Sequence, residues 1–274
     1  MNSEKNFIIA IPTYNRYDVL FKSDGPLQYL PESLRDNTFL FVREEELEKY
    51  LPVVEYFGIG MYPLDLNPED RMAETRDAIM KLAKEELGFR YIIMMDDDVK
   101  FAVHELENPK TTYHKMSPEE FETMCFKLVD VLNEETPLSG IKARQFSMDK
   151  KSETEENGRI IQVFGMDLDI ILSEGFKFNY GQPCISDYYF VITLLKNGYK
   201  NIVLNRYTRD DTPNSPGGCA TYRTAEMQTK SAVALYKLFP DVITLKQKKG
   251  SSWKEVRVNP IVRWKKAYRP RGEK

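Results

Sequence analysis

Short apolar runs alternate with amphipathic stretches through the first hundred residues, and this alternation limits the folds open to the chain. The runs at 7–12, 38–42 and 91–95 are almost wholly apolar, as expected of strands buried on both faces of a sheet. Residues 43–57 and 72–87 carry apolar side chains at helical spacing. Strands that alternate with helices predict an α/β fold with a mostly parallel, doubly wound sheet and right-handed crossovers.

The rest of the chain continues with further helices and strands. Ser117, Pro118 and Glu120 form a capping box with proline at the first helical position. Ser186 is expected to cap a second helix that stops at Gly198. The elements predicted here are helices at 117–133, 186–198 and 224–239, strands at 138–143, 159–164 and 201–205, an exposed hairpin tip at 149–158 and a Pro/Gly-rich loop at 209–219.

Charge is distributed unevenly along the chain. The formal net charge of −3 hides a segment, 245–274, with eleven Lys and Arg and two Glu, a balance of +9 against −12 for the residues before it. Trp253, Trp264 and Tyr268 lie in this segment. Cations interleaved with aromatic rings suit a polyanion, and the alternative is a solvated tail that wraps the acidic body. We therefore expect one domain at 1–244 and a basic C-terminal extension at 245–274.

Three consecutive carboxylates follow the apolar run at 91–95. Asp96, Asp97 and Asp98 repel one another unless a cation offsets their charge, and no His or Cys stands beside them. Oxygen ligands alone favour Mg²⁺ or Mn²⁺, which usually share phosphate oxygens with few protein ligands. Ligands bind at the carboxyl ends of strands in open α/β sheets. The triplet therefore predicts a divalent cation with a nucleoside diphosphate, and its alternative is a solvated acidic turn.

Four segments, in order, resemble the family-2-type glycosyltransferases of the GT-A fold. "FIIAIPTYNR" is similar to the family's opening strand, "RMAETRDAIMKLAKEELG" to its arginine-bearing helix, "MMDDDV" to its DxD motif and "ISDYYFVITLLKNGYKNIVLN" to an acidic residue that opens a later helix. The resemblance covers residues 6–210. It implies a GT-A fold, which is Rossmann-like with a mostly parallel sheet and flanking helices, and transfer of a sugar from a nucleotide sugar, with a UDP-sugar as the leading donor.

The resemblance also assigns roles to individual residues. Asp187 takes the position of the catalytic base, which implies inversion by single displacement, and the alternative is that it only helps Ser186 to cap its helix. Asp98 and Asp96 take the positions of ligands to Mn²⁺ or Mg²⁺. The residues implied to hold the nucleotide sugar are Pro12, Thr13, Tyr14, Arg16, Arg76, Asp96 and Asp97, with Arg71 as a further candidate.

The later part of the chain departs from the family pattern. Many members complete the metal site with a histidine after the base, and this chain has none after His114. Asp210 or Asp211 is therefore expected to supply a ligand. The arginines expected to hold the diphosphate are Arg206, Arg209 or Arg223. "FGMDLDIILSEG" resembles a segment that lines the sugar and acceptor pocket, which implies that Gly165, Met166 and Asp167 face the substrate, or else only pack or contact solvent. Gly217 and Gly218 are expected in a plain loop.

The basic segment bears on the acceptor. Phage TET-associated glycosyltransferases, which modify hydroxymethylated pyrimidines in DNA, are similar to this chain in size, in the DDD form of the motif and in the basic end. This resemblance implies that DNA is the partner and that its hydroxymethyl-pyrimidine base, or the sugar on that base, is the acceptor. The alternatives are a bacterial glycan or lipid-linked sugar as acceptor, nucleotidyl transfer on a related sheet, and a non-catalytic nucleic-acid-binding module on a degenerate GT-A fold.

The sequence also bears on cellular location. It has no apolar run long enough to cross a bilayer, and "MNSEKNF" lacks the layout of a signal peptide. Cys125, Cys184 and Cys219 are widely spaced and odd in number, unlike a disulfide framework. We expect a cytoplasmic protein, in the host cytoplasm if it is viral, with no integral membrane association.

Overall fold

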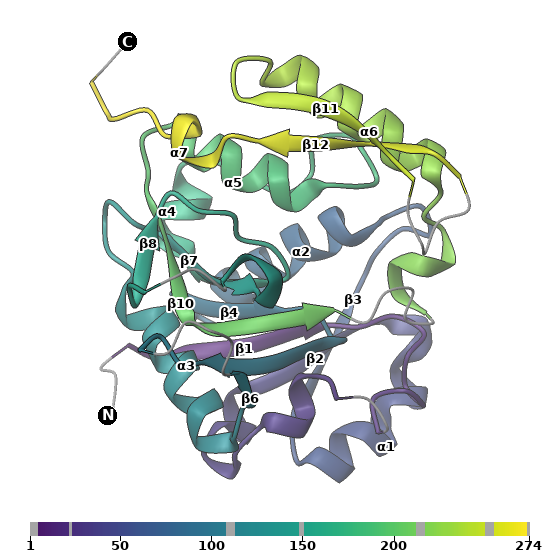
Figure 1. Ribbon diagram of the computed structural model, residues 1–274. Coiled ribbons are helices and arrows are strands. Elements are labelled where there is room, and N and C mark those ends of the chain that lie inside the picture. The colour runs from purple at the N-terminus through teal and green to yellow at the C-terminus, as the bar shows by residue number, and fades with distance from the viewer. Residues whose placement is uncertain are drawn as a thin grey trace.

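A computed structural model describes residues 5–21, 24–107, 113–147, 151–211, 217–249 and 255–272. Ten of the described strands form one sheet in the order β3-β2-β1-β4-β9-β7-β10-β5-β6, with β8 paired to β10 (Figure 1). These strands are β1 (Phe7–Pro12), β2 (Thr38–Arg43), β3 (Gly60–Leu64), β4 (Tyr91–Met95), β5 (Val99–His104), β6 (Tyr113–Lys115), β7 (Leu138–Ala143), β8 (Thr154–Glu156), β9 (Val163–Asp167) and β10 (Asn201–Asp211). The α-helices are α1 (Leu47–Phe57), α2 (Met72–Glu85), α3 (Pro118–Asp130), α4 (Leu168–Ser173), α5 (Ser186–Lys196), α6 (Ala225–Leu238) and α7 (Trp264–Ala267).

The predicted α/β alternation is confirmed in the first half of the chain. β1 lies between β2 and β4 and is parallel to both, and β3 joins the edge in parallel with β2. Alternate side chains of β1 enter two separate cores, so Ile8 packs with α2 and α5 while Ile9 packs with α1 and α3. The strand is apolar throughout because both of its faces are covered.

The second half of the sheet differs from the prediction. β9 runs antiparallel to β4 and begins at Val163, because Gln162 has a left-handed backbone (φ 66°) that ends the irregular stretch before it. The predicted strand at 159–164 therefore starts too early. The predicted hairpin tip at 149–158 is also wrong for its described residues, since β8 within it pairs with β10. β10 itself extends to Asp211, well past the predicted end at 205.

Helix α5 starts differently from the prediction. Ile185, with φ 66°, is the N-cap residue, and it makes no side-chain capping bond. Ser186 is already the first helical residue, so its predicted capping role is wrong. The predicted stop agrees with the structure, because the helix ends at Lys196 and Gly198 follows with φ 84°.

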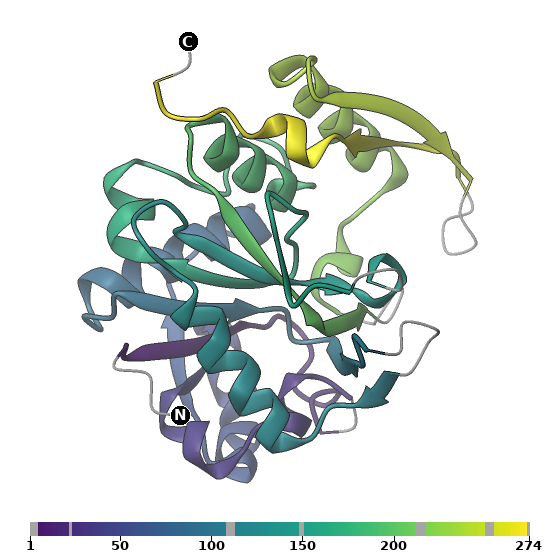
Figure 2. The ribbon, with the colours of Figure 1, turned by 60° about the vertical axis from the view of Figure 1, so that its left-hand side comes forward.

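The C-terminal residues fold onto the body of the protein. Strands β11 (Ile243–Lys248) and β12 (Arg257–Val262) form an antiparallel hairpin that packs on α6, and α7 packs beside α5 (Figures 1 and 2). The expected boundary between 244 and 245 therefore falls inside β11. Asp241 holds the end of the chain in place, since its carboxylate pairs with Lys196 and, at 3.0 Å, with Arg269. No helix in the described part of the chain has the length and apolar composition needed to cross a bilayer.

Candidate active site

The loop after β1 is tied to the middle aspartate of the triplet. Thr13 donates a hydrogen bond of 2.6 Å to Asp97, and Arg16 forms an ion pair with the same carboxylate. The Tyr50 hydroxyl lies 3.1 Å from that of Thr13 and accepts a 3.0 Å bond from the Arg16 backbone. Burial raises the pKa of Asp97, and the charge of Arg16 opposes that rise. The Asp97 carboxylate therefore holds the loop after β1 in place. Asp97 also lines the cavity that is described below.

Asp96 and Asp98 reach the cavity from the end of β4. Each side chain is 19% exposed, and Asp98 also lies 3.1 Å from Arg16. Asp96 forms a 2.7 Å ion pair with Arg76, and its backbone N–H donates to the carbonyl of Gln162. Burial raises the pKa of Asp96, and the Arg76 charge opposes the shift. Asp97 and Asp98 lie in the turn between β4 and β5.

Arg76 connects the triplet with the expected base. Its guanidinium is 2% exposed and pairs with both Asp96 and Asp187. The rings of Phe164 and Phe178 flank it at 5.2 and 5.3 Å. Helix α2 thus brings one buried cation between the carboxyl end of β4 and the first turn of α5. Arg76 is shielded from the cavity by its carboxylate partners, so it positions them and is not itself a ligand contact.

A cavity of about 1120 Å³ opens where β1, β2, β3 and β4 end. Six cationic side chains line it: Arg16, Arg43, Arg71, Arg223, Lys248 and Arg257. The guanidinium of Arg43 lies 5.3 Å from the ring of Tyr14, which is 39% exposed. Burial and the nearby charge of Arg223 lower the pKa of Arg257. Cations gathered at such close range favour an anion between them, as a diphosphate would provide.

Gly217 and Gly218 close one side of this cavity. The Gly218 backbone N–H donates to the carbonyl of Tyr14, at 2.9 Å. A Cβ atom on Gly217 would stand 2.4 Å from the carbonyl oxygen of Asn15, and the residue has φ 81°. Only glycine tolerates both conditions. The pair therefore clamps the segment after β10 onto the loop after β1, which is more than the plain loop expected from the sequence.

Two carboxylates at the cavity could hold a metal ion. Among the described residues, no three His, Cys, Asp or Glu side chains converge as a metal cluster. Asp96 and Asp98 border the cavity, and they suit Mg²⁺ or Mn²⁺, which take one or two carboxylates and complete their shell with phosphate and water. Asp210 does not line the cavity and pairs with Arg144 at 2.7 Å. Asp211 ends β10, and its side chain lies outside the described residues.

The structure does not bring Gly165, Met166 and Asp167 to the cavity, so the expected substrate-facing role is corrected. All three are buried in β9, which leads away from the site because it is antiparallel to β4. Asp167 lies opposite Tyr91, at the far end of β4 from the triplet, and forms a 2.8 Å ion pair with Arg90. The resemblance to the glycosyltransferases matched the order of segments along the chain, but it did not predict that β9 runs antiparallel to β4.

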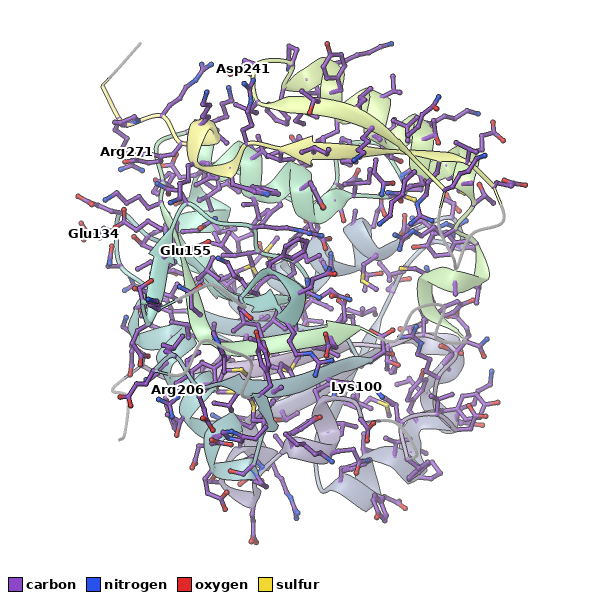
Figure 3. All side chains as sticks on the ribbon, in the orientation of Figure 1. Lys100, Glu134, Glu155, Arg206, Asp241 and Arg271 are labelled. Atoms are coloured by element: carbon purple, nitrogen blue, oxygen red, sulfur yellow. The ribbon has the colours of Figure 1, made fainter. Side chains whose placement is uncertain are left out.

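The arginines expected to hold the diphosphate separate into three positions. Arg223 lines the cavity. Arg209 is buried and donates to the side chain of Gln162, while Arg206, labelled in Figure 3, is exposed on β10 and does not line the cavity. Arg43 and Gln162 also line the cavity, and neither was predicted from the sequence. The sequence offered a signal for Arg43, because it follows the carboxyl end of the second predicted strand, where ligands bind in such sheets. It offered none for Gln162, which lies inside a stretch predicted as a strand.

Comparison with known proteins agrees with this geometry. Residues 7–218 match the family described as TET-Associated Glycosyltransferase. The chain belongs to the TET-associated glycosyltransferase family. No curated protein sequence matches the chain.

Solved structures share the fold of this TET-associated glycosyltransferase. S. aureus TarS 1–349 in complex with UDP-GlcNAc has 13% identity and a TM-score of 0.53, and the match covers 84% of this chain and 66% of that one. GalNAc-T7 with UDP, GalNAc and Mn²⁺ has 10% identity and a TM-score of 0.46, over 76% of this chain and 44% of that one. The chain spans about two thirds of the TarS 1–349 structures. The likeness to the UDP-GlcNAc complex of TarS shows that the fold is GT-A.

Proposed function

We propose that this TET-associated glycosyltransferase moves a sugar from a nucleotide-sugar donor to an acceptor hydroxyl with inversion at the anomeric carbon. The observation that carries the proposal is the chain of contacts Asp96–Arg76–Asp187, in which one buried guanidinium bonds the carboxylate at the donor cavity and the carboxylate at the start of α5. A donor site and a base must be adjacent for direct displacement, because the reacting atoms meet within about 3–3.5 Å.

The donor fits the cavity in two parts. The exposed ring of Tyr14, beside Arg43, suits a uracil or another base by stacking. The diphosphate suits the cationic wall formed by Arg43, Arg71, Arg223 and Arg257, with Asp96 and Asp98 opposite. Mn²⁺ or Mg²⁺ held by Asp96 and Asp98 would, when bound, stabilise negative charge on the departing nucleoside diphosphate.

Asp187 is the base in this proposal. The acceptor oxygen forms a bond to the anomeric carbon as the bond from that carbon to the diphosphate breaks, and the acceptor proton passes to the Asp187 carboxylate. Oδ1 of Asp187 is occupied by Arg76, and Oδ2 has no hydrogen bond from the described residues. Arg76 therefore fixes one oxygen and leaves the other to receive the proton.

The acceptor in this proposal is a hydroxymethyl-pyrimidine of DNA. The support is electrostatic, because Lys246, Lys265 and Lys266 are exposed on the hairpin and on α7. A bacterial glycan or lipid-linked sugar is the competing acceptor.

Calorimetry with UDP tests the donor half of the proposal. Affinity should rise when Mn²⁺ is added, and Asp98→Asn should remove most of that rise. Asp210→Asn is the matched control, since its carboxylate is also ion-paired but lies off the cavity. Equal effects of the two substitutions, or no effect of Mn²⁺ on wild-type affinity, would contradict the assigned metal site.

A transfer assay tests the base and the acceptor. Radiolabelled UDP-sugars are offered with hydroxymethylated DNA, unmodified DNA or a bacterial glycan extract. We expect label only in hydroxymethylated DNA, and a loss of about 10²- to 10⁴-fold in kcat for Asp187→Asn with UDP affinity retained. Label in the glycan extract alone would replace DNA as the acceptor, and full activity of Asp187→Asn would remove its role as base.

A further inference from the structure

A second cavity, of about 640 Å³, lies between α7 and the β7–β8–β10 side of the sheet. It shares no lining residue with the donor cavity. The aromatic side chains in its wall are Phe146, Tyr188 and Trp264, and Glu155, labelled in Figure 3, lies on the β8 side. This cavity therefore needs an occupant other than the donor.

The second cavity borders the residue that follows the proposed base in the sequence. Tyr188 lines the second cavity and directly follows Asp187 in the first turn of α5. Arg209, also in the second cavity, donates to the side chain of Gln162, which lines the donor cavity. A molecule in the second cavity is thus separated from the donor by the first turn of α5 and the Arg209–Gln162 pair.

The aromatic lining suits a flat molecule. The rings of Tyr188 and Trp264 lie 5.3 Å apart at 51° to each other. The planar guanidinium of Arg159 lies 5.2 Å from the ring of Tyr188 and 5.2 Å from that of Phe146. Phe146 remains 51% exposed, so one face of the assembly is open. Aromatic rings and arginine planes are the groups on which nucleobases stack.

Two buried polar atoms in the same wall have no partner. Oδ1 of Asn157 and Nε of Arg159 make no hydrogen bond to the residues that the structure describes. One is an acceptor and the other a donor, and leaving either buried without a partner is costly. A pyrimidine edge carries both kinds of group, whereas a lipid tail carries neither.

Charge around the second cavity favours a polyanion. Six Lys and Arg line it against a single Glu, and that residue, Glu155, is paired with Lys142 at 2.5 Å. Lys265 and Lys266 are exposed on α7, and neither forms an ion pair within the described ranges. A neutral glycan gains nothing from this excess of charge, whereas phosphates on either side of a base do.

We propose that the second cavity binds a base of the acceptor DNA that neighbours the modified one and is turned out of the stack. Trp264, Tyr188 and Arg159 hold its faces, and Lys265 and Lys266 hold the adjacent phosphates. The inference rests on the proposed DNA acceptor and deepens it by assigning a binding site for that DNA.

Binding of the full chain to DNA, measured separately from sugar transfer, tests this assignment. Fluorescence anisotropy is recorded with a labelled duplex that carries one hydroxymethyl-pyrimidine. Trp264→Ala should weaken binding about 5- to 100-fold, because it removes a stacking partner. Trp264→Phe should restore most of the loss. Tyr56→Ala is the matched control, since Tyr56 is an aromatic residue 72% exposed and outside both cavities.

The lysines give a second readout that does not depend on Trp264. Replacing Lys265 and Lys266 together by Ala should lower the slope of log affinity against log salt by about 2, while Lys81→Ala, on an exposed lysine of α2, should leave it unchanged. The inference is overturned if both the Trp264 and the lysine variants bind DNA as the wild type does.

UDP calorimetry separates this inference from the proposed function. Cavity variants that lose DNA affinity and keep UDP affinity support the DNA site in the second cavity. If the wild type does not bind UDP, the donor site is refuted, but the DNA-binding measurements remain valid. If the wild type transfers sugar to the glycan extract and does not bind DNA, the DNA site in the second cavity is overturned. The proposed sugar transfer itself would still be supported.

Discussion

Replacing Arg76 by methionine should lower the melting temperature far more than a similar change on the protein surface. The guanidinium is 2% exposed and pairs with Asp96 and Asp187, whose side chains are 19% and 20% exposed. Removing one partner of a buried ion pair costs about 3–5 kcal/mol, and we take about 3 kcal/mol because both carboxylates keep some hydration. At about 2–4 °C per kcal/mol, the melting temperature should fall by about 6–12 °C.

The decrease in melting temperature caused by Arg76→Met should also depend on pH. Burial raises the pKa of Asp96 and Arg76 opposes that rise, so Arg76→Met raises the pKa further. A carboxyl group with a higher pKa in the folded than in the unfolded state stabilises the fold at low pH, and that stabilisation is lost as the pH rises through the folded-state value. The gap in melting temperature between wild type and variant should therefore narrow from pH 8 to pH 5.

Thermal unfolding followed by circular dichroism measures both effects. Lys81→Met is the matched control on the same helix, because Lys81 is 69% exposed and its pair with Glu85, at 3.8 Å, is a surface contact. Surface pairs contribute about 0–1 kcal/mol, so the melting temperature of the control should shift by about 4 °C or less. Equal losses in the two variants, or a gap that is the same at pH 5 and pH 8, would refute the role assigned to Arg76.

Two further predictions concern the glycine clamp and a buried carboxyl group. Gly217→Ala should weaken UDP binding about tenfold, because the added Cβ atom would displace the loop after β1. Gly175→Ala is the control, since Gly175 has a similar φ of 71° and open space around it, and it should leave UDP binding unchanged. Equal UDP affinities of the two variants in calorimetry would contradict the clamp. Burial raises the pKa of Asp77 to about 6, and its carboxylate accepts hydrogen bonds from the backbone of Phe178 and Asn179. Because the folded-state pKa of Asp77 lies above its ordinary value, the wild type should lose stability relative to Asp77→Asn as the pH rises from about 4 to 6. Parallel curves of melting temperature against pH for the two proteins would show that Asp77 does not cause this pH dependence.

The local elements of the first hundred residues could be predicted from the sequence alone. β1, β2, α1, α2 and β4 were all anticipated, because a strand buried on both faces must be apolar throughout and a helix on one face must be amphipathic. The position of Asp96–Asp98 at a sheet edge followed from the same pattern. These features depend on neighbours in the chain, which the sequence displays directly.

The partners of each residue were decided only by the tertiary structure. Gly165, Met166 and Asp167 were expected at the substrate, but the antiparallel direction of β9 takes them to the far end of β4. Arg76 was expected at the ligand, but it lies buried between Asp96 and Asp187. The sequence determined which segments are strands and helices and which carry charge. It did not determine strand direction or the pairing of distant charges, because both depend on contacts between residues far apart in the chain.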